Sequence, residues 1–192
     1  MANNSRTTHG FRLPRLGSMP AVPGLLLVLL ALAAPAAAAP FDDLWPPDLG
    51  DCQELQVRPG NRLSLHGFGV GVQIYRWNGT GWTFVAPQAV LFADASESAI
   101  VSIHFGGPTW EGVDGSEVVG SVIQTCTPDP SAIPWQLLGA ASTTGPGVFD
   151  GVTFIQRLNT VGGTAPAIPG AFVGQVVRVP YTADYLFYRA DH

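Results

Sequence analysis

Positive charge is scarce in this sequence, which contains no lysine at all. After residue 40 only six basic residues remain, all of them arginine, against all fourteen acidic residues, so this part carries a formal charge of −8. Nucleic acids and anionic membranes are bound by basic protein faces. The charge balance therefore argues against nucleic acid and against an anionic membrane as partners.

The sequence also lacks an apolar run long enough to cross a membrane, which needs about 20 residues. Its apolar run Leu25–Ala34 follows a segment with three arginines and no acid, and small residues follow it at Ala37–Ala39. This arrangement is typical of a secretory signal peptide. We therefore predict a signal peptide over residues 1–39, cleaved near Ala37–Ala39, and a secreted or periplasmic mature protein without a membrane span. An uncleaved anchor is the alternative.

Cysteine is rare too, because Cys52 and Cys126 are the only two in the chain. The roughly 150 residues that follow the signal peptide suffice for one domain with its own core. In an exported protein the two cysteines could form a disulfide, which would add about 4 kcal/mol in the chain-entropy model. Two separate buried thiols are the alternative.

Helical periodicity is absent as well, and glycine and proline together make up 40 of the 192 residues. Short alternating apolar runs between turn residues indicate β-strands. We predict an all-β domain, an antiparallel sandwich or barrel, over residues 53–192 after an extended lead-in at 40–52. The expected strands are 53–58, 70–75, 82–86, 89–92, 99–105, 117–126, 135–141, 148–158, 172–179 and 185–189.

Alternation predicts how two of these strands face. Val70, Val72 and Ile74 share one face of the strand over 70–75, and Gly71, Gln73 and Tyr75 share the other. The following Asn78-Gly79 predicts a hairpin, because both residues tolerate positive φ. In the strand over 99–105, His104 is expected to point away from the more apolar face.

The stretch 104–120 holds the candidate catalytic residues, His104 and Glu111. An imidazole and a carboxylate can act as an acid–base pair. A metal site needs three or four convergent ligands, and no G-x-G-x-x-G opens a helix, so we predict neither metal nor cofactor. Alternatively, His104 lies partly exposed at a strand end, while Glu111 and Asp114 hydrogen-bond the backbone of turns.

Trp110, Tyr75 and Arg157 are the candidate ligand-binding residues. Aromatic rings such as Trp110 and Tyr75 could stack on a sugar or another planar small molecule; alternatively they fill the core. Arg157 lies on an otherwise apolar strand, and a buried arginine is usually paired. Pairing with Glu111 or Asp184 is therefore the alternative to a role in binding.

Several motifs together resemble the DUF3455 family. They are Gly71-Val-Gln-Ile-Tyr75, Gly107-Pro-Thr-Trp-Glu111, Ile133-Pro-Trp135, Asn159-Thr-Val-Gly-Gly163 and Val179-Pro-Tyr-Thr-Ala-Asp184. The resemblance covers about residues 55–190 and implies a secreted protein of a family whose name records unknown function. Members often carry a cysteine where this chain has Trp77, so the resemblance leaves Cys52 and Cys126 as the one available pair.

These observations favour a secreted binding or envelope-associated module whose partner is a small molecule or a glycan. A small extracellular enzyme using His104 and Glu111 is the second hypothesis. A surface protein that self-associates through an open sheet edge is the third.

Overall fold

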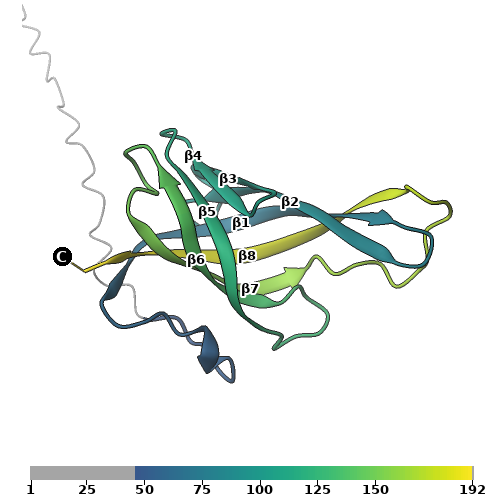
Figure 1. Ribbon diagram of the computed structural model, residues 1–192, viewed down its shortest axis with the longest axis horizontal. Coiled ribbons are helices and arrows are strands. Elements are labelled where there is room, and N and C mark those ends of the chain that lie inside the picture. Colours follow the sequence, from purple (N-terminus) through teal and green to yellow (C-terminus); the bar gives the residue numbers. More distant parts are fainter. Residues whose placement is uncertain (1–45, 192) are drawn as a thin grey trace, which may run out of the picture. The chain divides into compact units, whose positions relative to one another are not determined.

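The computed structural model describes residues 46–191, and within them the chain is almost entirely antiparallel β-sheet. The predicted signal peptide and residues 40–45 of the predicted lead-in lie outside the described residues. Neighbouring strands pair in sequence order and β8 pairs back with β1, so the sheet closes into a barrel (Figure 1). The strands are β1 (Asn61–Trp77), β2 (Trp82–Phe92), β3 (Ile100–Phe105), β4 (Thr109–Gly112), β5 (Glu117–Cys126), β6 (Trp135–Thr144), β7 (Val152–Gly162) and β8 (Val176–Ala190). The all-β prediction is confirmed, and the barrel replaces the sandwich.

The predicted hairpin at Asn78-Gly79 is confirmed as the β1–β2 connection. The loop spans residues 78–81, and the Asn78 Oδ1 atom accepts hydrogen bonds from the backbone N–H groups of Thr80 and Gly81, both at 2.9 Å. Gly79 takes φ 104°, a conformation that favours glycine. The two strands expected over 82–86 and 89–92 form the single strand β2.

Three strands continue past the ring and form what we call the arm, residues 73–77, 82–88 and 176–180. β3 pairs with β2 only from Ala89 onward, and β7 ends at Gly162, so the arm has two unpaired edges (Figure 1). The predicted break around Pro180 was wrong, because β8 runs through it. The Pro180 carbonyl accepts a hydrogen bond from the Gly163 N–H on the side of β8 that faces β7. The N–H that proline lacks would point to the same side, at the place where β7 ends.

The polar faces of β1 and β3 line the inside of the barrel. Gln73 and His104 are 2% and 3% exposed, whereas Ile103, on the outer face of β3, is 45% exposed. The expectation that His104 lies partly exposed at a strand end was wrong. Glycine at inward positions makes room for large rings instead of aliphatic side chains. At Gly69, for example, a Cβ atom would lie 2.6 Å from the Tyr185 ring.

A strap, residues 46–58, covers the outer face of the barrel where apolar side chains point outward. Residues 53–58 do not form the predicted strand: Gln53–Leu55 is a single 3-10 turn, η2. The backbone N–H of Leu55 bonds the Cys52 carbonyl at 3.0 Å, so it is satisfied within the strap rather than by the sheet. Strap side chains pack on β6, β7 and β8 in a second apolar cluster, made up of Leu49, Cys52, Leu55, Val57, Leu137, Leu158, Leu186 and Tyr188.

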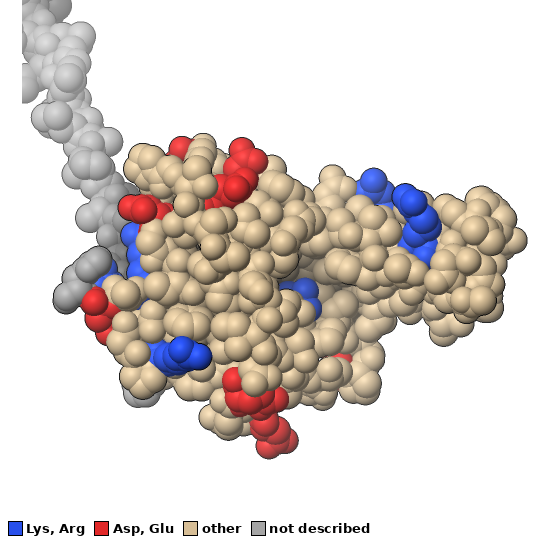
Figure 2. Space-filling view, viewed as in Figure 1, with Lys and Arg blue, Asp and Glu red and all other residues tan. Residues whose placement is uncertain are grey.

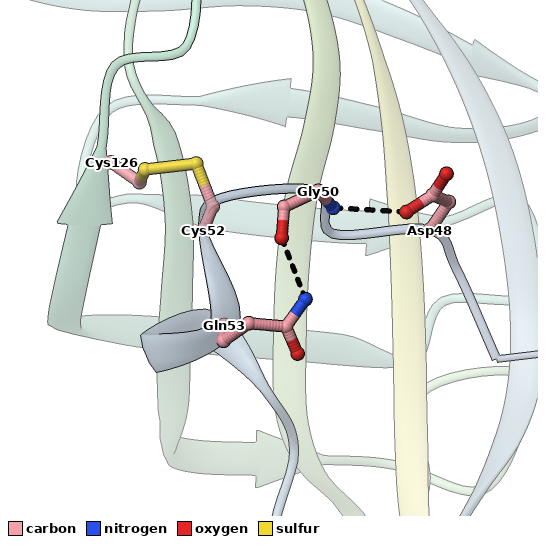
Figure 3. Close-up of a disulfide and its surroundings, with 5 residues drawn as sticks. All are labelled: Asp48, Gly50, Cys52, Gln53 and Cys126. Atoms are coloured by element: carbon pink, nitrogen blue, oxygen red, sulfur yellow. Dashed lines mark hydrogen bonds between the residues drawn. A yellow bond between two sulfur atoms is a disulfide. The ribbon is translucent and has the colours of Figure 1, made fainter.

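The Cys52–Cys126 disulfide ties this strap to the end of β5 (Figure 3). Its Cα atoms lie 5.8 Å apart, and the described residues contain no free cysteine. Next to it, Asp48 accepts from the Gly50 N–H at 2.9 Å, and the Gln53 side chain donates to the Gly50 carbonyl at 2.7 Å. The predicted pairing of Cys52 with Cys126 is therefore confirmed.

Across residues 46–191, no helix has the length and apolarity needed to cross a bilayer.

Candidate functional site

A pocket of about 480 Å³ opens at the end of the barrel from which the arm extends. Side chains from β1 to β8 and from the loop before β6 contribute to it. Figure 2 shows a recess in the described surface with atoms of a basic residue inside it. The volume lies within the usual range for small-molecule sites, about 300–1,000 Å³. The lining residues used below are Gln73, Tyr75, Phe84, His104, Trp110, Val122, Ile133, Arg157 and Tyr185.

Two stacked rings and a third that meets them at a steep angle form the floor of this pocket. His104 and Trp110 are cross-strand partners on β3 and β4, and their ring centroids lie 4.3 Å apart with planes 8° from parallel. Tyr185 of β8 lies 5.3 Å from the first ring and 5.6 Å from the second. A Cβ at Gly120 would lie 3.1 Å from Trp110, so glycine in β5 leaves room for the indole. Trp110, one of the candidate ligand-binding residues, thus lies in the floor of the pocket beside Tyr185.

His104 is a neutral imidazole in this setting. Its Nδ1 atom lies 2.8 Å from the Thr109 carbonyl, which can only accept, so Nδ1 carries the proton and Nε2 keeps a lone pair. Burial lowers the pKa of His104 to about 4; the bond to Thr109 opposes this shift, and the positive charge of Arg157 adds to it. At neutral pH the pocket therefore receives a hydrogen-bond acceptor from His104 rather than a charge.

Glu111 does not join His104. It pairs in register with Ile103 and is exposed on the outer face of the barrel, whereas His104 and Trp110 point inward. Successive side chains in a strand point to opposite faces, which separates this carboxylate from the pocket. The residues proposed as an acid–base pair are therefore not brought together.

Asp114 holds a turn, as the alternative reading predicted. Its carboxylate accepts from the Ser116 backbone N–H at 3.0 Å, the Ser116 hydroxyl at 2.7 Å and the Val148 N–H at 2.7 Å. These hydrogen bonds, led by the Ser116 hydroxyl, lower the pKa of Asp114. Within residues 46–191 no group of three or more His, Cys, Asp or Glu side chains is placed to hold a metal ion.

Arg157 lies in the pocket and forms no ion pair with any residue of 46–191. Its Nε and Nη2 atoms donate to the Pro134 carbonyl at 3.2 and 2.7 Å. The expected pairing with Glu111 or Asp184 was wrong, because Asp184 instead accepts from Asn159 at 2.7 Å and lies 3.5 Å from His66 Nε2. Among the described residues that line the pocket, Arg157 is the one with a permanent charge.

Two buried donors in the pocket lining have no partner among the described residues, Gln73 Nε2 and Trp110 Nε1. Most buried polar groups in proteins are hydrogen-bonded, so two such donors in one pocket need an explanation. Tyr75 differs, because its hydroxyl donates to the Gly163 carbonyl at 2.7 Å. Burial raises the pKa of Tyr75, and the positive charge of Arg157 opposes this shift.

Sequence reasoning missed Gln73. The available signal was a glutamine that shares a strand face with glycine and tyrosine, a pattern that is equally typical of a solvent-facing side. Closure of the sheet turns that face toward the inside of the barrel, so the same pattern belongs here to a buried side.

Comparison with known proteins gives a family and no activity. The family model described as "Protein of unknown function (DUF3455)" matches residues 58–189. No curated protein matches the chain, and no solved structure does.

Proposed function

Because this chain belongs to the DUF3455 family, whose description assigns no activity, we propose a function from the pocket itself: the protein binds a small molecule in the mouth of its barrel. Two buried donors that have no partner within the described part of the chain, Gln73 Nε2 and Trp110 Nε1, carry this proposal. Leaving a buried donor unpaired costs about 1–3 kcal/mol, so a ligand acceptor that bonds either donor would remove that cost.

The walls of the pocket support a ligand with an apolar body. Phe84, Val122 and Ile133 are apolar residues of its lining, and the His104–Trp110 stack forms its floor. Phe84 and Val122 are 52% and 48% exposed, although both are large and apolar. Binding sites for small molecules commonly combine such walls with a few placed polar groups.

Binding outside the cytoplasm is part of the proposal. The disulfide between Cys52 and Cys126 supports it, since such bonds persist in oxidising compartments. The predicted signal peptide over residues 1–39 is consistent with the same location.

The test uses a neutral fluorescent probe, N-phenyl-1-naphthylamine, whose emission rises in apolar surroundings. We expect saturable binding to the wild-type protein and at least tenfold weaker binding to Val122→Trp, because the indole would fill the mouth of the pocket. Ile123→Trp is the matched control: Ile123 is 46% exposed, similar to Val122, and does not line the pocket. Absence of saturable binding, or equal weakening in both variants, would contradict the proposed function.

A further inference from the structure

We infer that the ligand is an organic monoanion, a carboxylate on an apolar body, and that Arg157 binds its carboxylate. This inference rests on the proposed function and specifies the chemical class of the molecule bound in the same pocket.

The first argument is the free charge of Arg157. The guanidinium group is half-buried, and its Nε and Nη2 atoms are both committed to the Pro134 carbonyl. That double contact fixes the plane of the group, and its further hydrogen-bond partner among residues 46–191 is the uncharged Tyr185 hydroxyl. Arginines that leave bulk solvent are normally paired with an anion. No carboxylate among the described lining residues supplies one.

The second argument is an excess of donors in the pocket. Arg157 Nη1, Gln73 Nε2 and Trp110 Nε1 all donate, and the latter two are unpartnered among residues 46–191. These donors outnumber the His104 acceptor, and a carboxylate, which offers two oxygens with about four lone-pair sites and no donor, matches them. Hydrogen bonds from a charged donor to a carboxylate are also about twice as strong as neutral ones.

The third argument limits the charge to one. Arg157 is the single permanent cation in the described lining, and the neutral His104 contributes no second charge. A second anionic group would face Phe84, Val122 or Ile133, where it would lose water without gaining a partner. Dianions such as phosphate monoesters and dicarboxylates are therefore disfavoured.

The experiment compares three probes of the same ring system by displacement of N-phenyl-1-naphthylamine: 2-naphthoate, its neutral isostere 2-naphthamide, and naphthalene-2,6-dicarboxylate. We expect the wild-type protein to bind 2-naphthoate at least tenfold more tightly than either of the others, in line with a charge-assisted hydrogen bond. Arg157→Gln should abolish the preference for 2-naphthoate over 2-naphthamide. Arg62→Gln, which removes the same charge from an exposed site on β1, should keep it.

Equal affinity for 2-naphthoate and 2-naphthamide would overturn the inference, as would tighter binding of the dicarboxylate or a preference that survives in Arg157→Gln. The wild-type comparison decides the matter even where Arg157→Gln does not fold, since it needs no variant. The proposed function fails separately: in that case the neutral dye does not bind to the wild-type protein, whereas a failed carboxylate inference leaves dye binding intact.

Discussion

The two ends of the barrel interior are built differently. At the end away from the arm, Phe149 and Phe187 are fully buried with centroids 4.8 Å apart, among aliphatic side chains such as Leu65 and Val152. At the arm end, the buried groups around the cavity include a neutral imidazole and the Gln73 amide, whose Nε2 atom has no partner among residues 46–191. One end is thus close-packed, while the other contains polar groups that cost stability in the empty protein.

The Trp110 side chain contacts residues of both ends of the barrel interior. Its ring stacks on His104 on the pocket side and meets Phe187 edge to face at 5.7 Å on the packed side. The packed end therefore holds the floor of the pocket in place. This difference predicts that substitutions at the packed end act on stability, whereas substitutions at the pocket end can also act on binding or on pH dependence.

The largest effect is expected from Phe187→Ala. Truncating a fully buried phenylalanine leaves a cavity and costs about 3–5 kcal/mol in free energy of unfolding. Phe172→Ala is the matched control, because that ring is 66% exposed, and it should change stability by less than about 0.5 kcal/mol. Urea unfolding of both variants measures the difference; similar costs would mean that the packed end is not the main source of stability.

A smaller effect, confined to acid, is expected from His104. Its folded pKa of about 4 lies below the unfolded value of 6.5, so between these values the unfolded chain binds the proton and the folded protein does not. Stability should therefore be fully present above pH 6.5 and fall as the pH drops toward 4, by about 3 kcal/mol in total. Unfolding free energies from pH 7 to 4 should fall less steeply in His104→Gln than in the wild-type protein; parallel curves would contradict burial of the imidazole.

Gly69→Ala probes the room that glycine leaves for the rings. The new methyl group would lie 2.6 Å from Tyr185 Cε2 and 3.3 Å from the Ala183 carbonyl, so the tyrosine has to move. Overpacking of this kind costs about 1–3 kcal/mol. Gly81→Ala is the control, since nothing lies within 4 Å of a Cβ there. Thermal unfolding of the pair tests this, and equal midpoints would show that the Tyr185 ring is not held in place.

The features of the fold that could be predicted from the sequence are those that depend on residues close together in the chain. The strand Glu117–Cys126 was predicted with its exact bounds, and the hairpin at Asn78-Gly79 was predicted from its turn residues. Both depend on neighbouring residues alone. The disulfide followed from a count of two cysteines, although its role of tying a strap to β5 did not.

What could not be predicted is which face of each strand became the inside. Alternation gives two faces and no direction. His104 does point away from the more apolar face of its strand, and its partial exposure was wrongly expected because the more apolar face was assumed to be the inside. The strap over residues 46–58 adds to the ambiguity, since it buries outward side chains such as Leu158 and Leu186. Both faces of β7 and β8 are therefore apolar, and closure of the sheet decides between them.

The smallest expected effect separates stability from binding at a single residue, Gln73. Replacing it with leucine removes a buried amide donor that has no partner among the described residues, so the empty protein should gain about 1 kcal/mol in free energy of unfolding. The same change removes a donor from the pocket, so 2-naphthoate should bind several-fold more weakly. Gln124→Leu, at an exposed position on β5, should alter neither quantity. A destabilised Gln73→Leu with unchanged affinity would mean that the amide is satisfied in solution, and that the polar end of the barrel serves packing as much as the apolar end does.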